Sequence, residues 1–93
     1  MGTYVPAMAT TELDDLSGIP RYVQIAHAIE REIRSGKWET GKSAPSRAQI
    51  AQRYGVARET AAHAHRWLAE RGYLVAVAGV GMVVTPPDRW PVG

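Results

Sequence analysis

The chain has 93 residues, of which 45% are hydrophobic, and this is enough for one domain with a modest core. The absence of cysteine excludes disulfides and thiolate metal sites, and no apolar run is long enough to cross a membrane, so we expect a cytoplasmic protein. The net charge of +2 is unevenly distributed: residues 1–20 carry three acidic and no basic side chains, whereas residues 21–72 carry ten basic and five acidic ones. This excess suits a polyanionic partner, although solvated basic surfaces are also common.

The first predicted helix runs from about Arg21 to Ser35. Its apolar side chains recur every three or four residues and therefore share one face. Pro20 suits the start of a helix, where its missing N–H is not needed, and Gly36 suits a left-handed end. In the connector that follows, we expect Trp38 to pack beneath the helices, because an indole buries a large apolar area; stacking on a base is the alternative.

Two further helices are predicted on either side of a tight turn at residues 54–56. Ser46 and Gln49 have the spacing of a capping box, which marks the start of the first of them. The second runs from about residue 57 to residue 71 and ends at Gly72. A helix, a brief turn containing glycine and a second helix form the helix-turn-helix pattern, in which the second helix can lie in a DNA major groove.

The period of the helix at 57–71 separates an inward from an outward face, with Thr60 at the edge. The inward positions are Ala61, Ala64, His65 and Leu68, and the outward positions are Arg58, Glu59, Ala62 and His63. We expect His65 to be a partly buried histidine with its hydrogen bonds satisfied. His63 faces a base, a phosphate or water. The two rings point to different faces and cannot hold one metal ion.

Two β-prone runs follow at residues 73–77 and 82–85, with a glycine-containing turn between them. Such a hairpin needs the helices beneath it for stability. Trp67 is expected to cover His65 and Tyr73, with an exposed dimerisation surface as the alternative. The predicted fold class is mainly α with a small β-hairpin, a winged helix-turn-helix of three helices and a two-stranded wing.

Three segments follow from this pattern. Residues 1–18 show no hydrophobic period and contain an acidic patch, so we expect a flexible N-terminal tail. Residues 19–86 hold the predicted helices and hairpin and form the winged helix-turn-helix domain. Residues 87–93 are expected to be a short C-terminal tail.

An ordered string of short motifs runs from Tyr22 to Val84. The string comprises Y-x-Q-I-A from Tyr22, I-x-S-G-K-W from Ile33, Gly41 before Pro45-Ser46, I-A-x-R-Y-G-V from Ile50, Arg58-x-Thr60, Gly72-Tyr73-Leu74 and a G-x-G in the wing. Each piece alone is weak, but the ordered combination is specific. This part of the chain resembles the N-terminal DNA-binding domain of GntR-family bacterial transcription regulators.

The resemblance implies that the helix at 57–71 reads the major groove and that the wing at 73–85 lies over the flanking minor groove or backbone. Carried over by position, Arg58 is the candidate for a base contact, because its guanidinium can bond to O6 and N7 of a guanine. Thr60 is the candidate for a phosphate or a thymine methyl contact. Ser46 is expected to position the DNA backbone at its helix N-terminus, where free N–H groups favour a phosphate.

The other DNA-binding candidates are Arg47, Lys42, His63, Glu59, Gly79 and Gly81. The two glycines shape the wing so that its backbone can come close to DNA. Lys42 and Arg47 are either phosphate contacts or solvated charges. For Arg58 the alternative to DNA is a surface salt bridge with Glu59 or Glu70.

The sequence departs from the family pattern at several of these positions. Ala48, Ala62 and Val80 stand where the family usually has basic residues, and Ala57 replaces the usual capping serine, at a cost of about 1 kcal/mol. Three readings remain open: altered DNA specificity, weak affinity that relies on a dimer or a partner, and a shift from DNA to protein recognition.

We therefore expect a sequence-specific DNA-binding transcription regulator that represses by occupying an operator. One unit reads only a few base pairs, so the expected partner is a pseudo-palindromic operator in double-stranded DNA, bound by a homodimer. No catalytic constellation is found, and we expect no enzyme, cofactor, metal ion or membrane contact, and no small-molecule effector site within this chain. The alternative is a protein-interaction module that has lost DNA readout. The length of the chain fits either a short stand-alone regulator or a fragment of a longer one that carries an effector domain.

Overall fold

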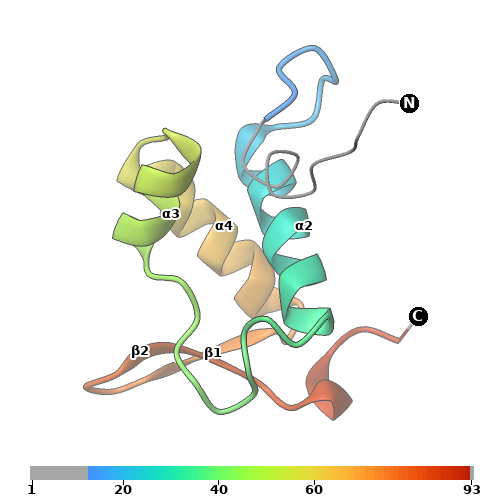
Figure 1. Ribbon diagram of the computed structural model, residues 1–93, viewed down its shortest axis with the longest axis vertical. Coiled ribbons are helices and arrows are strands. Elements are labelled where there is room, and N and C mark those ends of the chain that lie inside the picture. Colours follow the sequence, from blue (N-terminus) through green and yellow to red (C-terminus); the bar gives the residue numbers. More distant parts are fainter. Residues whose placement is uncertain (1–12, 93) are drawn as a thin grey trace, which may run out of the picture.

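Within residues 13–92, which the computed structural model describes, the chain forms three α-helices and a two-stranded antiparallel sheet (Figure 1). The elements are α2 (Arg21–Arg34), α3 (Arg47–Tyr54), α4 (Arg58–Glu70), β1 (Leu74–Val77), β2 (Gly81–Val84) and the one-turn 3₁₀ helix η1 (Pro87–Arg89). This arrangement confirms the predicted winged helix-turn-helix. Residues 1–12 of the predicted N-terminal tail lie outside the described residues.

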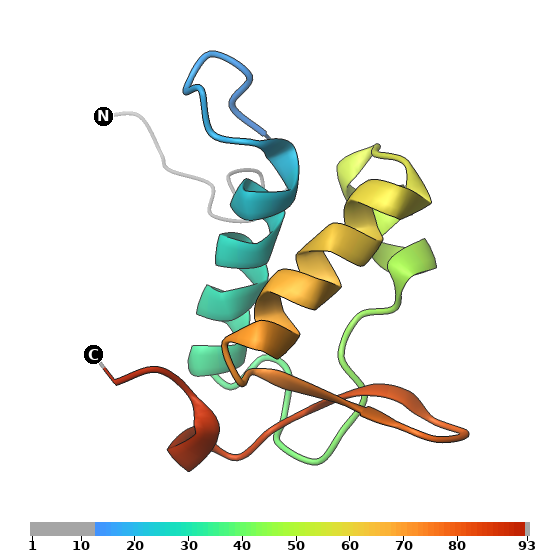
Figure 2. The ribbon, with the colours of Figure 1, turned by 180° about the vertical axis from the view of Figure 1, so that it is seen from behind.

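The helices gather above the hairpin, which extends beneath α3, whereas the C-terminal segment turns to the opposite side (Figures 1 and 2). In the hairpin, Leu74 lies opposite Val84 and Val77 lies opposite Gly81. β2 therefore begins one residue earlier than predicted. Gly79 and Gly81 have φ angles of 78° and 109°, a region that residues with a Cβ rarely adopt, so glycine is required to turn the wing here.

The connector between α2 and α3 runs antiparallel beside β2. The N–H of Gly41 donates to the carbonyl of Val84 at 2.9 Å, and the N–H of Val84 donates back to Lys42 at 3.0 Å. The N–H of Ala44 donates to Met82 at 2.9 Å. The outer edge of the wing is thus paired with the segment that leads directly into α3.

One apolar cluster joins the three helices to the base of the hairpin. Its fully buried large side chains are Tyr73, Ile25, Ile29, Ile33, Ile50, Leu68 and Val84. Ala61 and Ala64 of α4 are also fully buried, and their small side chains let the neighbouring helices approach closely. The inward positions predicted for α4 are therefore confirmed, and the opposite side of that helix faces outward.

The helix ends follow the predicted local chemistry. Ser46 Oγ accepts the Gln49 N–H at 3.1 Å, and Gln49 Oε1 accepts the Ser46 N–H at 2.8 Å, so the capping box is formed. Gly55 ends α3 with a left-handed φ of 68°. At the start of α4, Ala57 provides no side-chain cap, as expected.

A buried carboxylate connects α2 to α3. Glu32 accepts hydrogen bonds from Arg53 at 2.5 and 3.1 Å and from Trp38 Nε1 at 2.8 Å, and Lys37 Nζ lies 3.5 Å away. Burial alone would raise the pKa of Glu32, but these hydrogen bonds and the two positive charges outweigh burial, and the pKa lies below its ordinary value. Trp38 packs against the core, as predicted, and its N–H is held by this network.

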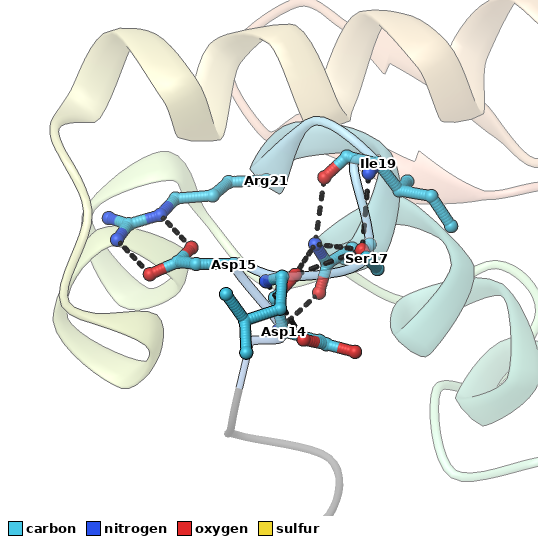
Figure 3. A network of polar contacts seen from close by, with 7 residues as sticks. Asp14, Asp15, Ser17, Ile19 and Arg21 are labelled. Atoms are coloured by element: carbon cyan, nitrogen blue, oxygen red, sulfur yellow. Dashed lines mark hydrogen bonds and ion pairs between the residues drawn. The ribbon is translucent and has the colours of Figure 1, made fainter.

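Residues 13–18, which the sequence analysis assigned to the tail, fold against the start of α2. Arg21 places its guanidinium fork on the carboxylate of Asp15, with both hydrogen bonds at 2.9 Å (Figure 3). Gln24 Oε1 accepts the N–H of Asp14 at 2.7 Å, and its Nε2 donates to the carbonyl of Ile19 at 2.8 Å. Residues 13–18 therefore pack against the N-terminal end of α2.

The C-terminal segment also contacts the fold. The rings of Trp90 and Tyr73 lie 5.7 Å apart, and the Arg34 guanidinium lies over both. Arg34 also donates to Tyr73 Oη at 2.9 Å and to the carbonyl of Pro91 at 2.7 Å. Part of the segment predicted as a tail at 87–93 therefore packs at the base of α2.

Candidate nucleic-acid interface

The first turn of α4 is exposed. Arg58 and Glu59 are solvent-accessible, and Thr60 is half-buried at the edge, where its period places it. Within residues 13–92 the Arg58 guanidinium has neither a hydrogen bond nor an ion pair, so the alternative pairing with Glu59 or Glu70 is not formed. The free guanidinium at this position can reach a ligand without breaking an internal contact.

His63 lies differently from its expected outward position. Its ring is half-buried and packs edge-on against Tyr22 of α2, with ring centroids 5.4 Å apart and an interplanar angle of 84°. The period of α4 placed His63 on the outward face, but a helix period does not show the aromatic neighbour on α2 against which the ring packs. A DNA contact by His63 stays a prediction.

His65 is the buried, satisfied histidine that the sequence predicts. It lies on the inner side of α4, and its Nε2 is 2.7 Å from the carbonyl oxygen of Pro45. A carbonyl can only accept, so Nε2 carries the proton. Burial lowers the pKa of His65, the hydrogen bond to Pro45 opposes this, and the positive charge of Arg47 adds to the lowering. The ring of His65 thus ties α4 to Pro45, which lies two residues before α3.

Trp67 packs on the domain, but against other partners than those predicted. Its ring centroid lies 4.8 Å from that of His27, and the guanidinium of Arg71 stands 3.8 Å from the indole ring. The aromatic neighbour of Tyr73 is Trp90. The prediction for Trp67 was wrong because His27 is distant from Trp67 in the sequence, as Trp90 is from Tyr73, and only the fold brings these rings together.

A groove of about 640 Å³ lies between the start of α3, the outer side of α4 and the hairpin. Its lining consists of Ser43, Ala44, Ser46, Arg47, Gln49, Ala62, His65, Arg66, Ala76, Val80, Gly81 and Met82. Three of the predicted DNA-binding residues, Ser46, Arg47 and Gly81, come together here. The other candidates, Lys42, Arg58, Glu59, Thr60, His63 and Gly79, lie outside its lining.

Arg66 is the groove residue that the sequence analysis missed. It is exposed, and no carboxylate is among the described residues that line the groove. The sequence carried a signal for it, because Arg66 lies one turn beyond Ala62 on the same face of α4. The interface therefore has Arg58, unpaired among residues 13–92, at the start of α4, and Arg47 and Arg66 beside the groove.

The described residues contain no group of three or more metal-ligating side chains that could hold an ion. No helix in the described part of the chain is long and apolar enough to span a membrane.

Comparison with known proteins identifies the family. The model of the gntR family of bacterial regulatory proteins matches residues 21–84. This chain belongs to the GntR family. The histidine utilization repressor of Klebsiella aerogenes is 37% identical over 68 residues, which are 73% of this chain and 28% of that repressor. The transcriptional regulator TreR of Bacillus subtilis is 32% identical over 71 residues, which are 76% of this chain and 30% of TreR.

Solved structures of GntR proteins share the fold. YtrA of Sulfolobus acidocaldarius, a GntR-family transcription factor, is 31% identical with a TM-score of 0.73, over 83% of this chain and 81% of that one. The DBD of AraR in complex with operator ORX1 is 30% identical with a TM-score of 0.69, over 78% of this chain and 87% of that one. The GntR family consists of regulators, so the prediction of no enzyme is confirmed, and the protein-interaction alternative is not favoured.

The chain spans less than a third of the length of the two curated relatives named above.

Proposed function

We propose that this chain binds an operator in double-stranded DNA and thereby represses transcription, with α4 in the major groove and the wing over the flanking minor groove or backbone. One observation carries the proposal: the first turn of α4 presents the guanidinium of Arg58, which has no partner among residues 13–92, on a fold similar to one solved with an operator. Relatives that are named as repressors support the direction of regulation.

Arg58 reads a base in this proposal. Its fork matches the O6 and N7 acceptors of guanine, and no internal partner competes for it within the described residues. Glu59 on the same turn can accept a hydrogen bond from the amino group of a cytosine, and Thr60 can contact a phosphate or a thymine methyl. Ser46 and Lys42 serve the backbone, and Gly79 and Gly81 let the wing approach it.

A homodimer on a pseudo-palindromic operator follows from the size of the unit. One α4 reads only a few base pairs, and two copies on neighbouring half-sites supply the missing specificity. Such a regulator acts in the cytoplasm, where bacterial DNA lies.

Selection of bound duplexes from a random DNA pool, followed by mobility shifts on the selected site, tests the proposal. The Arg58→Ala variant should lose about 1–3 kcal/mol of binding free energy and relax the preference at one base pair. Arg89→Ala is the matched control, because it removes an exposed arginine from η1, on the other side of the molecule (Figure 2). If wild type binds no duplex at low salt, or if the two variants bind alike, the proposal is wrong.

A further inference from the structure

The wing carries no charge. From Gly72 to Pro87 the sequence contains no acidic or basic side chain, and Ala62, which faces the wing across the groove, adds none. A DNA-binding surface nevertheless needs cations close to the phosphates, because the release of counterions supplies most of the sequence-independent affinity. Positive charge beside the wing must therefore come from its neighbours, which are Lys42 on the connector paired with β2 and the basic residues of α3 and α4.

The groove places two arginines where that charge is needed. Arg47, the first residue of α3, lines one wall, and Arg66 of α4 lines the other. The rest of the lining combines small or apolar side chains, among them Ala62, Ala76 and Met82, with polar ones such as Ser43 and Gln49. The described residues that line the groove include no carboxylate, which would repel a phosphate. The capping box occupies the N–H groups of Ser46 and Gln49, but those of Arg47 and Ala48 have no partner among the described residues, and such N–H groups at a helix start favour an anion.

Arg66 has no competing partner within residues 13–92. Its guanidinium makes no hydrogen bond or ion pair there, although Glu70 follows one turn later on α4. It lies eight residues after Arg58, which is roughly 12 Å along the helix axis and about 80° around it. The two side chains therefore reach different parts of a duplex, and Arg66 is the one beside the wing.

We propose that the groove seats one strand of the DNA backbone and that Arg66, together with Arg47, contacts its phosphates. A guanidinium fork matches two phosphate oxygens, which favours arginine over lysine for this role. The inference rests on the proposed function and adds charged contacts to the DNA backbone, which the uncharged side chains of the wing cannot make. In this proposal Arg58 contacts a base and determines sequence preference, whereas Arg66 contacts phosphates and raises affinity for any sequence.

The test measures the affinity of the full chain for its selected site and for an unrelated duplex, at salt concentrations from about 50 to 200 mM. Arg66→Ala should weaken binding to both duplexes by a similar factor, roughly three- to tenfold, because a backbone contact carries no sequence information. The slope of log K against log salt should become shallower by about 0.9 for each lost phosphate contact. Arg66→Lys should keep most of the slope, and Arg89→Ala should match wild type.

The outcomes separate this inference from the proposed function. Wild-type slope in Arg66→Ala, with Arg58→Ala still defective, overturns the phosphate role of Arg66 and leaves DNA binding in place. A loss for Arg66→Ala that is confined to the selected site means a base contact and also overturns it. No DNA binding by wild type overturns both. Thermal unfolding of Arg66→Ala serves as the folding control. Because the side chain is exposed and has no partner in the described part of the chain, we expect the wild-type midpoint.

Discussion

Arg53 and Arg66 lie on adjacent helices and have opposite surroundings. Arg53 places its fork on the buried carboxylate of Glu32, with its own side chain only 24% exposed, and its guanidinium lies 5.2 Å from the centre of the Tyr54 ring. Arg66 is exposed beside a groove and has no ion-pair partner in the described part of the chain. The first cation holds the fold together, and the second is available to a ligand.

The difference shows that a count of basic residues overstates the binding surface. Residues 21–72 carry ten of them, but several are committed to internal contacts. Arg34 stacks on two aromatic rings, Arg71 stacks on Trp67, and Arg21 pairs with Asp15. The guanidinium groups that face a partner are those that have no acceptor among the described residues of the chain.

The largest effect is expected for Arg53→Ala. The Glu32 side chain is 8% exposed, so removal of its main partner leaves a buried carboxylate with too few donors. We expect a loss of about 2–3 kcal/mol in the free energy of unfolding, measured by urea denaturation. Arg66→Ala under the same conditions should stay within about 0.5 kcal/mol of wild type. Equal losses of unfolding free energy in the two variants would show that Arg53 and Arg66 do not differ in their contribution to stability.

A smaller effect is expected from pH, through His65 beneath the groove. Its pKa in the folded state is lowered by burial, so the unfolded chain binds more protons once the pH falls below the ordinary value of about 6.5. Stability should therefore decrease from about pH 6.5 downward, until the pH passes the lowered folded pKa. The decrease ought to vanish in His65→Leu, which retains His27 and His63. A slope that persists in this variant would assign the titration to another group.

Arg47 offers a finer measurement on the same histidine. Its charge contributes to the lowered pKa of His65, so neutralising it in Arg47→Gln should move that pKa upward, as followed by NMR titration of the ring. An upward shift reports that the Arg47 guanidinium lies close to His65. An unchanged pKa would place the guanidinium elsewhere and weaken the case for its phosphate contact.

The smallest effect is expected for Asp15→Asn. Asp15 and Arg21 form the same two-pronged contact as Glu32 and Arg53, but their side chains are 60% and 52% exposed. The hydrogen bond from Arg21 and its charge lower the pKa of Asp15, yet solvent competes for both groups. The thermal midpoint should stay at the wild-type value. A loss as large as that of Arg53→Ala would mean that burial does not explain the difference between the two pairs.

The sequence predicted those parts of the fold that depend on local chemistry. Ser46 and Gln49 lie three residues apart, and this spacing alone determines the capping box at the start of α3. The period of α4 placed His65 inward for the same reason, because each position on a helix fixes the direction of its side chain. Arg47 and Arg58 became DNA-binding candidates through the resemblance to the GntR family, and their contacts with DNA stay predictions.

What the sequence did not predict depends on contacts between distant segments. The Tyr22 ring that holds His63 lies on another helix, and Trp90 meets Tyr73 only because the C-terminal segment turns back. Arg66 was missed because the sequence does not show that the hairpin lies beside the later turns of α4. Only the fold places Arg66 in a groove together with residues of the wing. Such pairings become visible only when the packing of the elements is known.

The hydrogen bonds between the connector and β2 have a consequence for binding entropy. Ala44 bonds to Met82, and the next residue, Pro45, accepts from His65, so wing, α4 and the start of α3 are joined within two residues. The spacing between α3 and the wing is therefore set before any ligand arrives. A preorganised groove loses little conformational freedom on association, and more of each contact with DNA then appears as affinity.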